Sequence, residues 1–223
     1  MRVCILIPVH NEEKTLPSLI ESIRKKGLDV VVVNDGSSDA SGQKAMDKGA
    51  YVLHHPIKQG KGASLKEGFQ YILNKPYDGL ITMDGDGQHD VGDIDAFLKA
   101  AETTGADVIV GNRMADARGM PPLRYLTNRF MSFLISCACK VSIADTQCGF
   151  RYITCQALKE IRLDTNDFEI ETEMLMKASR AKMKIACVAI KTIYRNEESK
   201  VHPFKDTIRF FKYFFRELWT SKK

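Results

Sequence analysis

Four consecutive valines, at positions 30–33, constrain most strongly what this chain can fold into. A β-strand that reads as a continuous apolar run is buried on both faces, and such strands are typical of parallel sheets covered by helices. Shorter apolar runs predict further strands at residues 2–8, 50–54, 79–83 and 107–110. The segment 28–33 is therefore predicted to be a central strand of an α/β fold.

Helical periodicity alternates with these strands. Residues 12–26 are predicted to be a helix, because apolar side chains recur there at spacings of three and four: Leu16, Leu19, Ile20 and Ile23. Further helices are predicted at residues 39–48, 63–73 and 94–102. The alternation predicts an α/β domain with a Rossmann-like, mostly parallel sheet and helices on both faces.

Beyond residue 113 the periodicity is weaker. We expect a loop from residue 115, a helix from 123, a strand from 150, a second helix from 169, a strand from 184, a polar loop from 195 and a final aromatic helix from 204. With no internal repeat and no linker, residues 1–203 are predicted to be one domain, followed by an amphipathic segment at 204–223.

Polar clusters follow four of the predicted strands, at residues 10–12, 34–37, 84–86 and 111–113. Because ligands of open α/β sheets bind outside the carboxyl ends of the strands, these clusters predict one binding site. Asp84 and Asp86 are two apart on an acidic turn, and paired carboxylates can converge on a hard cation, with Gln88 adding an amide oxygen. The alternative is an ordinary Asp-Gly turn.

Basic and polar residues elsewhere offer contacts to a nucleotide or to phosphates. Asp35 could accept hydrogen bonds from a base or ribose, although the residues after it could simply cap a helix. The segment 58–64 is glycine-rich and basic but is not a Walker A loop, so it is a weak indication. Arginine guanidinium groups suit diphosphate oxygens, which makes Arg113 and Arg195, with Lys200, candidates, whereas Arg129 and Arg151 are more simply explained as surface residues.

Several classes of protein are excluded. The chain has no Gly-x-Ser-x-Gly elbow and no Gly-x-Gly-x-x-Gly after its first strand, which argues against a serine hydrolase and a nicotinamide dehydrogenase. No apolar run approaches the roughly 20 residues that span a bilayer. The six cysteines form no Cys-x-x-Cys pair, and with no signal peptide they predict reduced thiols in a cytoplasmic protein.

Basic charge is concentrated at the C-terminal end. The net charge of the chain is +5, and residues 195–223 contribute +4 of it, from eight Lys or Arg and four Asp or Glu. Apolar side chains of the final helix fall on one stripe, with basic residues largely opposite: Phe204, Ile208, Phe211, Phe215, Leu218 and Trp219. This pattern predicts a helix in an anionic membrane interface, or one that docks on its own core, rather than a nucleic-acid-binding protein.

Four motifs in order resemble one family. Ile-Pro-Val-His-Asn-Glu-Glu at 7–13, Val-Asn-Asp-Gly-Ser-Ser-Asp at 33–39, Met-Asp-Gly-Asp-Gly-Gln-His at 83–89 and Asp-Thr-Gln-Cys-Gly-Phe-Arg at 145–151 are similar to those of inverting family-2 glycosyltransferases of the GT-A fold. The Gln-Cys-Gly-Phe-Arg stretch and the segment 195–201 resemble the dolichyl- and polyprenyl-phosphate hexose synthases in particular. The sequence departs from that family where His10 and Asn34 stand, at positions that often hold an aromatic residue and an aspartate.

The resemblance implies a function and a set of site residues. The donor would be a nucleotide-diphosphate sugar such as GDP-mannose or UDP-glucose, held by Pro8, His10, Glu12, Val33, Asp35, Asp84, Gly85 and Asp86. Mg²⁺ or Mn²⁺ would be bound by Asp84, Asp86 and Gln88, while phosphates of donor or acceptor would be held by Arg113, Arg195 and Lys200. The acceptor would be a polyprenyl phosphate, reached from the cytoplasmic face of the membrane by a peripheral protein.

Other functions remain compatible with these residues. A glycosyltransferase acting on a sugar or lipid hydroxyl would need a catalytic base, for which Glu171 and Glu173 are the candidates, although both could be surface carboxylates of a helix. A nucleotidyltransferase also uses paired aspartates and a metal. A nucleotide-binding module without activity is disfavoured by the presence of the acidic turn, Asp35 and the basic loop together.

Overall fold

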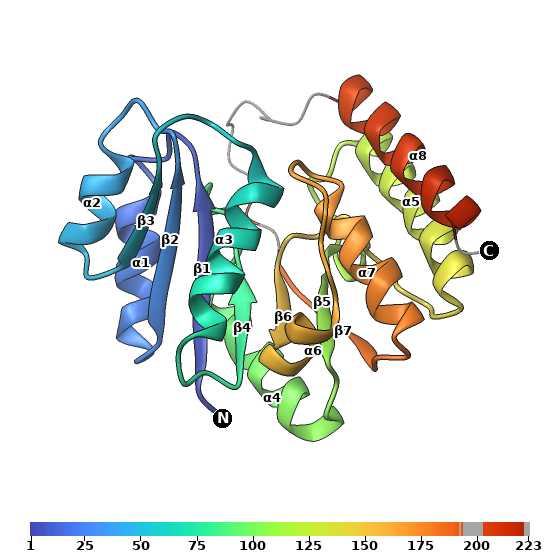
Figure 1. The fold of residues 1–223 in the computed structure, drawn as a ribbon, viewed down its shortest axis with the longest axis horizontal. Helices are drawn as coiled ribbons and strands as arrows, with labels where there is room; N and C mark the ends of the chain where they lie inside the picture. Colours follow the sequence, from blue (N-terminus) through green and yellow to red (C-terminus); the bar gives the residue numbers. More distant parts are fainter. Residues whose placement is uncertain (192, 194–202, 221–223) are drawn as a thin grey trace.

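Seven strands form one sheet in the computed structural model, which describes residues 1–191, 193 and 203–220. The strands are β1 (Val3–Val9), β2 (Asp29–Asp35), β3 (Tyr51–His55), β4 (Gly79–Thr82), β5 (Val108–Asn112), β6 (Arg151–Thr154) and β7 (Ile185–Ala189). Their order across the sheet is β3-β2-β1-β4-β6-β5-β7 (Figure 1). The four valines of β2 are buried, as expected for a strand covered on both faces.

The sheet is mostly parallel, as predicted, with one reversal. β1 pairs in parallel with β2 and β4, β2 with β3, and β5 with β7. β6 is inserted antiparallel between β4 and β5. The apolar pattern gives no strand direction, so this reversal was not predicted.

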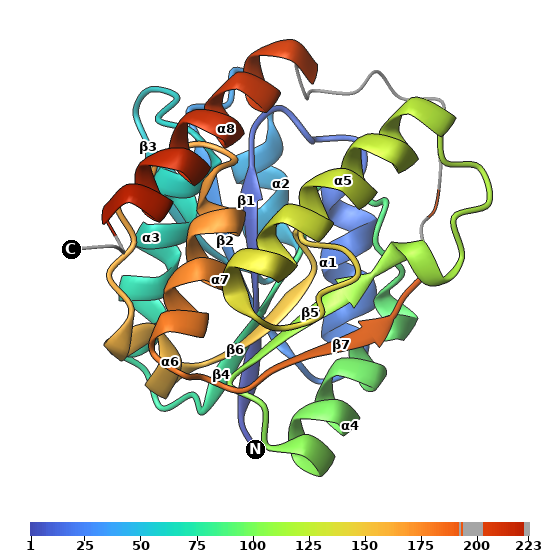
Figure 2. The same cartoon turned by 90° about the vertical axis from the view of Figure 1, so that its right-hand side faces the viewer.

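Helices cover both faces of the sheet, also as predicted (Figure 2). They are α1 (Leu16–Lys25), α2 (Ser41–Asp47), α3 (Lys61–Leu73), α4 (Ile94–Thr104), α5 (Pro122–Cys139), α6 (Cys155–Glu160), α7 (Ile170–Arg180) and α8 (Pro203–Thr220), with short 3-10 turns at Val91–Asp93 and Arg113–Ala115. α3 and α6 contact each other on one face, and α1 and α4 lie on the other. The short helix α6 was not predicted. Its N-terminus is capped by the side chain of Thr154, which accepts from the backbone N–H of Ala157.

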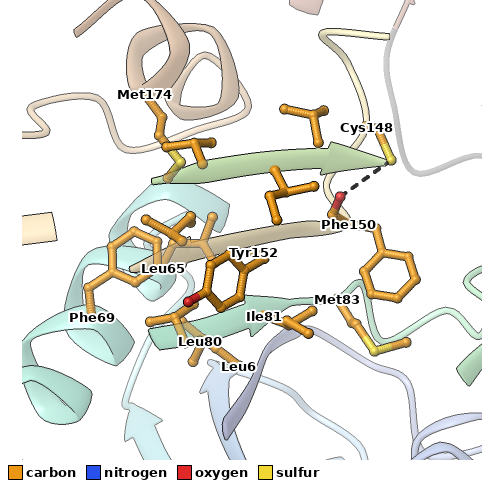
Figure 3. Packing of buried hydrophobic residues seen from close by; sticks show 14 of the residues in the cluster. Leu6, Leu65, Phe69, Leu80, Ile81, Met83, Cys148, Phe150, Tyr152 and Met174 are labelled. Atoms are coloured by element: carbon orange, nitrogen blue, oxygen red, sulfur yellow. Dashed lines mark hydrogen bonds between the residues drawn. The ribbon is translucent and has the colours of Figure 1, made fainter. Parts of the chain in front are cut away.

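The core continues from the sheet into the last helices. Figure 3 shows Leu65 and Phe69 of α3 and Met174 of α7 gathered with side chains of β4 and β6. α7 contacts both α5 and α8, so these two helices form an outer layer on the same side of the molecule. α8 contributes three buried aromatic side chains to the core, Phe210, Tyr213 and Phe214. Within the described residues, no helix combines the length and apolarity that crossing a bilayer requires.

Candidate active site

A cavity of about 260 Å³ lies at the carboxyl ends of β1, β2, β4 and β5. Most of the predicted site residues line it: Pro8, His10, Glu12, Asp35, Asp84, Gly85, Asp86, Gln88 and Arg113. The four polar clusters therefore do meet at one edge of the sheet. Val33 does not line the cavity, because its side chain is fully buried in β2. The predicted phosphate ligands Arg195 and Lys200 lie outside the described residues.

The acidic turn that follows β4 is already paired with a lysine. Lys61 Nζ, at the start of α3, lies 2.5 Å from Asp84 Oδ1 and 2.7 Å from Glu171 Oε1. The Lys61 side chain is only 13% exposed. The sequence singled out the glycine-rich segment around Lys61 but gave no reason to place its ammonium group at the acidic turn.

Charge around the acidic turn is unequally distributed between its two carboxylates. Burial alone would raise the pKa of Asp84, but the charge of Lys61 lowers it to about 2. Burial, and after it the negative charge of Asp84, raise the pKa of Asp86 to about 6. Asp86 Oδ1 also accepts a hydrogen bond from the backbone N–H of Gln88, which fixes the turn. Because Lys61 neutralises the charge of Asp84, the negative charge that remains at the turn lies on Asp86.

A neutral histidine forms the wall beneath this turn. His89 is buried and stacks on Phe150 with ring centroids 4.8 Å apart. The backbone N–H of Asp84 donates to Nδ1 of His89, so the ring proton is on Nε2, 3.9 Å from Asp84 Oδ2. Burial lowers the pKa of His89 to about 4, which keeps the ring uncharged at neutral pH.

The motif at 145–151 builds the opposite wall. Arg151 is fully buried and donates to the backbone carbonyls of Thr146, Cys148 and Glu171. Its role is therefore structural, and both alternatives that the sequence offered for Arg151, a phosphate contact and a surface position, are wrong. Gly149 has no room for a side chain, since a Cβ there would lie 2.8 Å from Lys61 Nζ and 2.9 Å from both Asp84 Oδ2 and Glu171 Oε1.

Arg113 lines the cavity but is held by a buried partner. Its Nε and Nη2 donate to the two carboxylate oxygens of Asp145 at 2.7 and 2.9 Å, and its backbone N–H donates to the same group. The carboxylate of Asp145 keeps the pKa of Arg113 above its usual range even though burial alone would lower it. A guanidinium fixed in this way presents a permanent positive charge to the cavity.

The opposite end of the cavity is organised by Asp35. Its carboxylate accepts from the backbone N–H groups of Gln59 and Gly60 at 2.7 and 2.9 Å, and from Nδ1 of His55 at 2.7 Å. Nε2 of His55 in turn contacts Glu67. Asp35 therefore ties the end of β2 to the glycine-rich segment that leads into Lys61, in addition to lining the cavity.

The segment after β1 is fastened to the segment after β2. His10 Nδ1 donates to the backbone carbonyl of Asp35, and the backbone N–H of Glu12 donates to Ser41 Oγ. Asn11 has a φ of 56°, in the left-handed region that asparagine tolerates, and its side chain accepts from the backbone N–H of Ser38. These bonds hold His10 and Glu12 on the cavity wall.

The two candidate bases are placed very differently. Glu171 lines the cavity and binds Lys61. Glu173 is fully buried outside the cavity, where it accepts from the backbone N–H groups of Asp164 and Thr165 and pairs with Lys177. Glu173 is therefore neither a catalytic base nor a surface carboxylate. Three further residues that the sequence did not identify line the cavity: Arg124, Asp167 and Phe168.

The donor set suits a divalent cation that shares its ligands with a substrate. Among the residues that the structure describes, no three His, Cys, Asp or Glu side chains are grouped to hold a metal ion. Two carboxylates completed by substrate phosphate oxygens are, however, a common way for proteins to bind Mg²⁺. The ammonium of Lys61 on Asp84 shows that this position accepts a cation.

Known proteins resemble this chain in both sequence and structure. The chain is 30% identical to glycosyltransferase AglJ of Haloferax volcanii, covering 99% of this chain and 72% of that protein. It is also 30% identical to the undecaprenyl-phosphate mannosyltransferase of Micrococcus luteus, covering 90% and 88%. Glucosyl-3-phosphoglycerate synthase from Mycobacterium tuberculosis, solved with Mn²⁺, uridine diphosphate and phosphoglyceric acid, matches with a TM-score of 0.76 at 19% identity, covering 98% and 78%.

The structural match establishes the fold, and the sequence matches establish the family. Residues 4–162 match the model of glycosyl transferase family 2, which is more than half of the chain. The order of strands and the acidic turn at the cavity agree with that assignment. This protein therefore belongs to glycosyl transferase family 2 and is a glycosyltransferase of the GT-A fold.

Proposed function

We propose that this enzyme transfers a hexose from a nucleotide-diphosphate sugar, of the GDP-mannose or UDP-glucose class, to a polyprenyl phosphate with inversion. One observation carries the proposal. A single cavity combines the carboxylate pair Asp84 and Asp86 with four cationic side chains, Lys58, Lys61, Arg113 and Arg124. Such a site suits two phosphorylated substrates, one bound through a cation and one through fixed positive charges. Relatives named for polyprenyl phosphates support this acceptor class.

The cation in this proposal is Mg²⁺ or Mn²⁺ held by Asp84 and Asp86, with the amide oxygen of Gln88 as a further ligand. When bound, it would neutralise the negative charge that develops on the departing nucleoside diphosphate. The nucleoside would lie along Pro8, His10, Glu12 and Asp35, which share one wall of the cavity.

The transfer itself needs no proton to be removed from the acceptor. An oxygen of the acceptor phosphate forms a bond to the anomeric carbon while the bond from that carbon to the diphosphate oxygen breaks, and the bonding electrons leave with the diphosphate. Attack from the opposite face inverts the anomeric carbon. The task of Arg113 and Arg124, which we propose also for Arg195 and Lys200, is then to position anionic groups.

A hydroxyl acceptor in cell-envelope glycan synthesis is the second candidate, because Glu171 is a carboxylate on the cavity wall. A hydroxyl group would have to lose its proton to such a base. The hydrogen bond from Lys61 already occupies one oxygen of Glu171, which favours a positioning role for that residue over proton abstraction.

Paired acceptors distinguish the two candidates. Purified enzyme is supplied with labelled GDP-mannose or UDP-glucose, Mn²⁺, and either a polyprenyl phosphate or the polyprenol of the same length. We expect label in the lipid fraction with the phosphate alone, and tolerance of Glu171→Gln to within about tenfold. Equal rates with the alcohol, together with an inactive Glu171→Gln enzyme, would replace the lipid phosphate by a hydroxyl acceptor.

We further propose that the protein contacts the cytoplasmic face of the membrane through α5 and α8. Seven apolar side chains on the outer sides of these helices are each more than half exposed: Leu123, Leu126, Phe130, Phe133, Ile208, Phe215 and Trp219. Figure 2 shows α5 and α8 running in nearly the same direction across this side of the molecule. Exposed basic residues, Arg129, Lys212 and Arg216, accompany them and suit anionic headgroups.

The structure also changes what is expected of α8. The sequence left two alternatives for this helix, a membrane interface or docking on the core. Phe210 and Phe214 are buried against α7 and the core, whereas Phe215 and Trp219 point outward. One face of α8 therefore docks, and a second face remains available for lipid, so the two alternatives do not exclude each other.

A further inference from the structure

Lys61 occupies an unusual position for a residue of a metal-dependent site. Its ammonium group bridges Asp84 and Glu171, and the ring of Phe168 lies 5.7 Å from it. Gly149 lies directly behind the cluster without a side chain. Within the described part of the chain, Lys61 is the cation in direct contact with the acidic turn.

Two cations that contact the same carboxylate oxygen repel each other, so each of them binds this oxygen more weakly than it would alone. A divalent ion at Asp84 and Asp86 would meet the positive charge of Lys61 at Asp84 Oδ1, and like charges at such distances repel strongly in a partly buried site. A nucleoside diphosphate relieves the conflict, because its oxygens can take both the metal ion and an ammonium group. The long, flexible lysine stem allows the ammonium to move while Glu171 retains it.

We propose that Lys61 is a resident counter-cation of the acidic turn, which occupies Asp84 in the ligand-free enzyme and exchanges that contact for a diphosphate oxygen when the donor binds. This inference rests on the metal and donor roles proposed above. Lys61 would then make metal and nucleotide binding depend on each other. The metal ion alone binds weakly because Lys61 competes for Asp84, and the nucleotide removes the competitor.

The test measures Mn²⁺ binding directly, by the electron paramagnetic resonance signal of free Mn²⁺, with and without UDP or GDP. Lys61→Met and Lys61→Gln both remove the charge, and Lys61→Gln retains a polar group in case the methionine variant does not fold. Lys66→Met is the matched control. Lys66 is five residues further along α3, and its ammonium binds Asn166 and the carbonyl of Asp164 instead of the acidic turn.

We expect both Lys61 variants to bind Mn²⁺ without nucleotide about tenfold or more tighter than the wild type, the size of a charge-assisted contact. Nucleotide should tighten Mn²⁺ binding strongly in the wild type and in Lys66→Met, and much less in the Lys61 variants. Because binding coupling is reciprocal, Mn²⁺ should also improve nucleotide affinity less in those variants.

Two outcomes would overturn the inference in distinguishable ways. If the folded Lys61 variants bind Mn²⁺ alone no tighter than the wild type, Lys61 does not compete for Asp84, and the proposed metal site stands without it. If the wild type binds no Mn²⁺ even with UDP or GDP, the proposed metal role fails and the inference fails with it.

Discussion

At the scale of single residues, the site is built from charges that are neutralised by neighbours on other elements. Asp145 neutralises Arg113, Lys61 is shared by Asp84 and Glu171, and Arg151 is held by backbone carbonyls. Isolated buried charges are costly, so each must find such partners. The exception is Asp86, because Asp84 repels its carboxylate, and the hydrogen bond from Gln88 and the charge of Lys61 offset this repulsion and the cost of burial only in part.

The first prediction follows from that exception. Asp86→Asn should lower kcat about 100-fold or more, because a carboxylate that holds the counter-charge of the leaving group is lost. It should not lower the melting temperature of the metal-free protein, since the substitution removes a repulsion. Asp90→Asn is the control, because Asp90 is four residues away and only caps the turn at Val91–Asp93. An Asp86→Asn enzyme that remains fully active in excess chelator would contradict the metal role.

The second prediction concerns Gly149. Gly149→Ala places a methyl group within 3 Å of Lys61, Asp84 and Glu171, whose flexible ends can move apart. We expect a loss of transfer rate of about tenfold or more with a small change in melting temperature. Gly105→Ala should give the reverse, because Gly105 has a φ of 61° at the end of α4 and open space around it. That variant should lose about 1 kcal/mol of stability and keep its activity. Equal activity losses in both variants would contradict the role of Gly149.

Sequence reasoning succeeds for residues whose position follows from a strand end. Asp35, Asp84 and Arg113 each follow a predicted strand, and all three line the cavity. It fails for the contact between Lys61 and Glu171, because these residues are 110 positions apart and only the tertiary fold brings them together. It fails for Glu173 as well, because nothing in a helical pattern distinguishes a carboxylate that faces a cavity from one that binds a loop.

At the scale of elements, one loop connects α6 to α7 and supports the glycine-rich segment of the site. Gly60 and Gly62 pack so closely on this loop that a Cβ at Gly60 would lie 2.5 Å from the carbonyl oxygen of Asn166. The backbone N–H of Ala63 also donates to that oxygen. Glu173 holds the loop from beneath, so it positions Lys61 indirectly.

The third prediction is the effect of acid on this support. Burial alone would raise the pKa of Glu173, but hydrogen bonds from Lys177 and Thr165 lower it below its ordinary value of 4.5. The unfolded chain therefore takes up this proton first, and the stabilisation from Glu173 is lost as the pH falls below about 4.5.

Glu173→Gln should destabilise the protein at pH 7 by about 1–3 kcal/mol, because the amide cannot accept all of these bonds. The difference in unfolding free energy from the wild type, measured in urea, should shrink as the pH is lowered from 5 to 3. Glu102→Gln, at an exposed position of α4, is the control. A difference that stays constant over this range would show that Glu173 does not depend on its ionised form.

The elements themselves were predicted to different degrees. The first half of the chain follows a regular alternation, and its strands and helices lie within a few residues of the predicted ranges. In the second half, β6 is antiparallel and α6 has only six residues, too short for a period to be recognised. Partner choice in a sheet depends on tertiary packing, which a single strand sequence does not encode.

At the scale of the whole molecule, the cavity and the apolar side of α5 are connected by one helix. Arg124, near the start of α5, lines the cavity, while Leu123 and Leu126 on either side of it are exposed. A lipid phosphate that enters beside α5 could therefore place its headgroup at Arg124 while its chain remains in the bilayer. The same helix would bind the membrane and receive the acceptor.

The last prediction tests this arrangement on the intact protein. Phe130→Ser with Phe133→Ser on α5, and Phe215→Ser with Trp219→Ser on α8, each remove two aromatic side chains that are more than half exposed. Burying one such side chain in an apolar phase contributes about 1.5–3 kcal/mol. Each double variant should therefore lower binding to phosphatidylglycerol vesicles at least about tenfold in a sedimentation assay, and wild-type binding should weaken as salt is raised. Met46→Ser, on α2 away from these helices, should bind as the wild type does. If only the α8 variant loses binding, α5 does not contact the bilayer, and if neither does, the membrane role of this side is wrong.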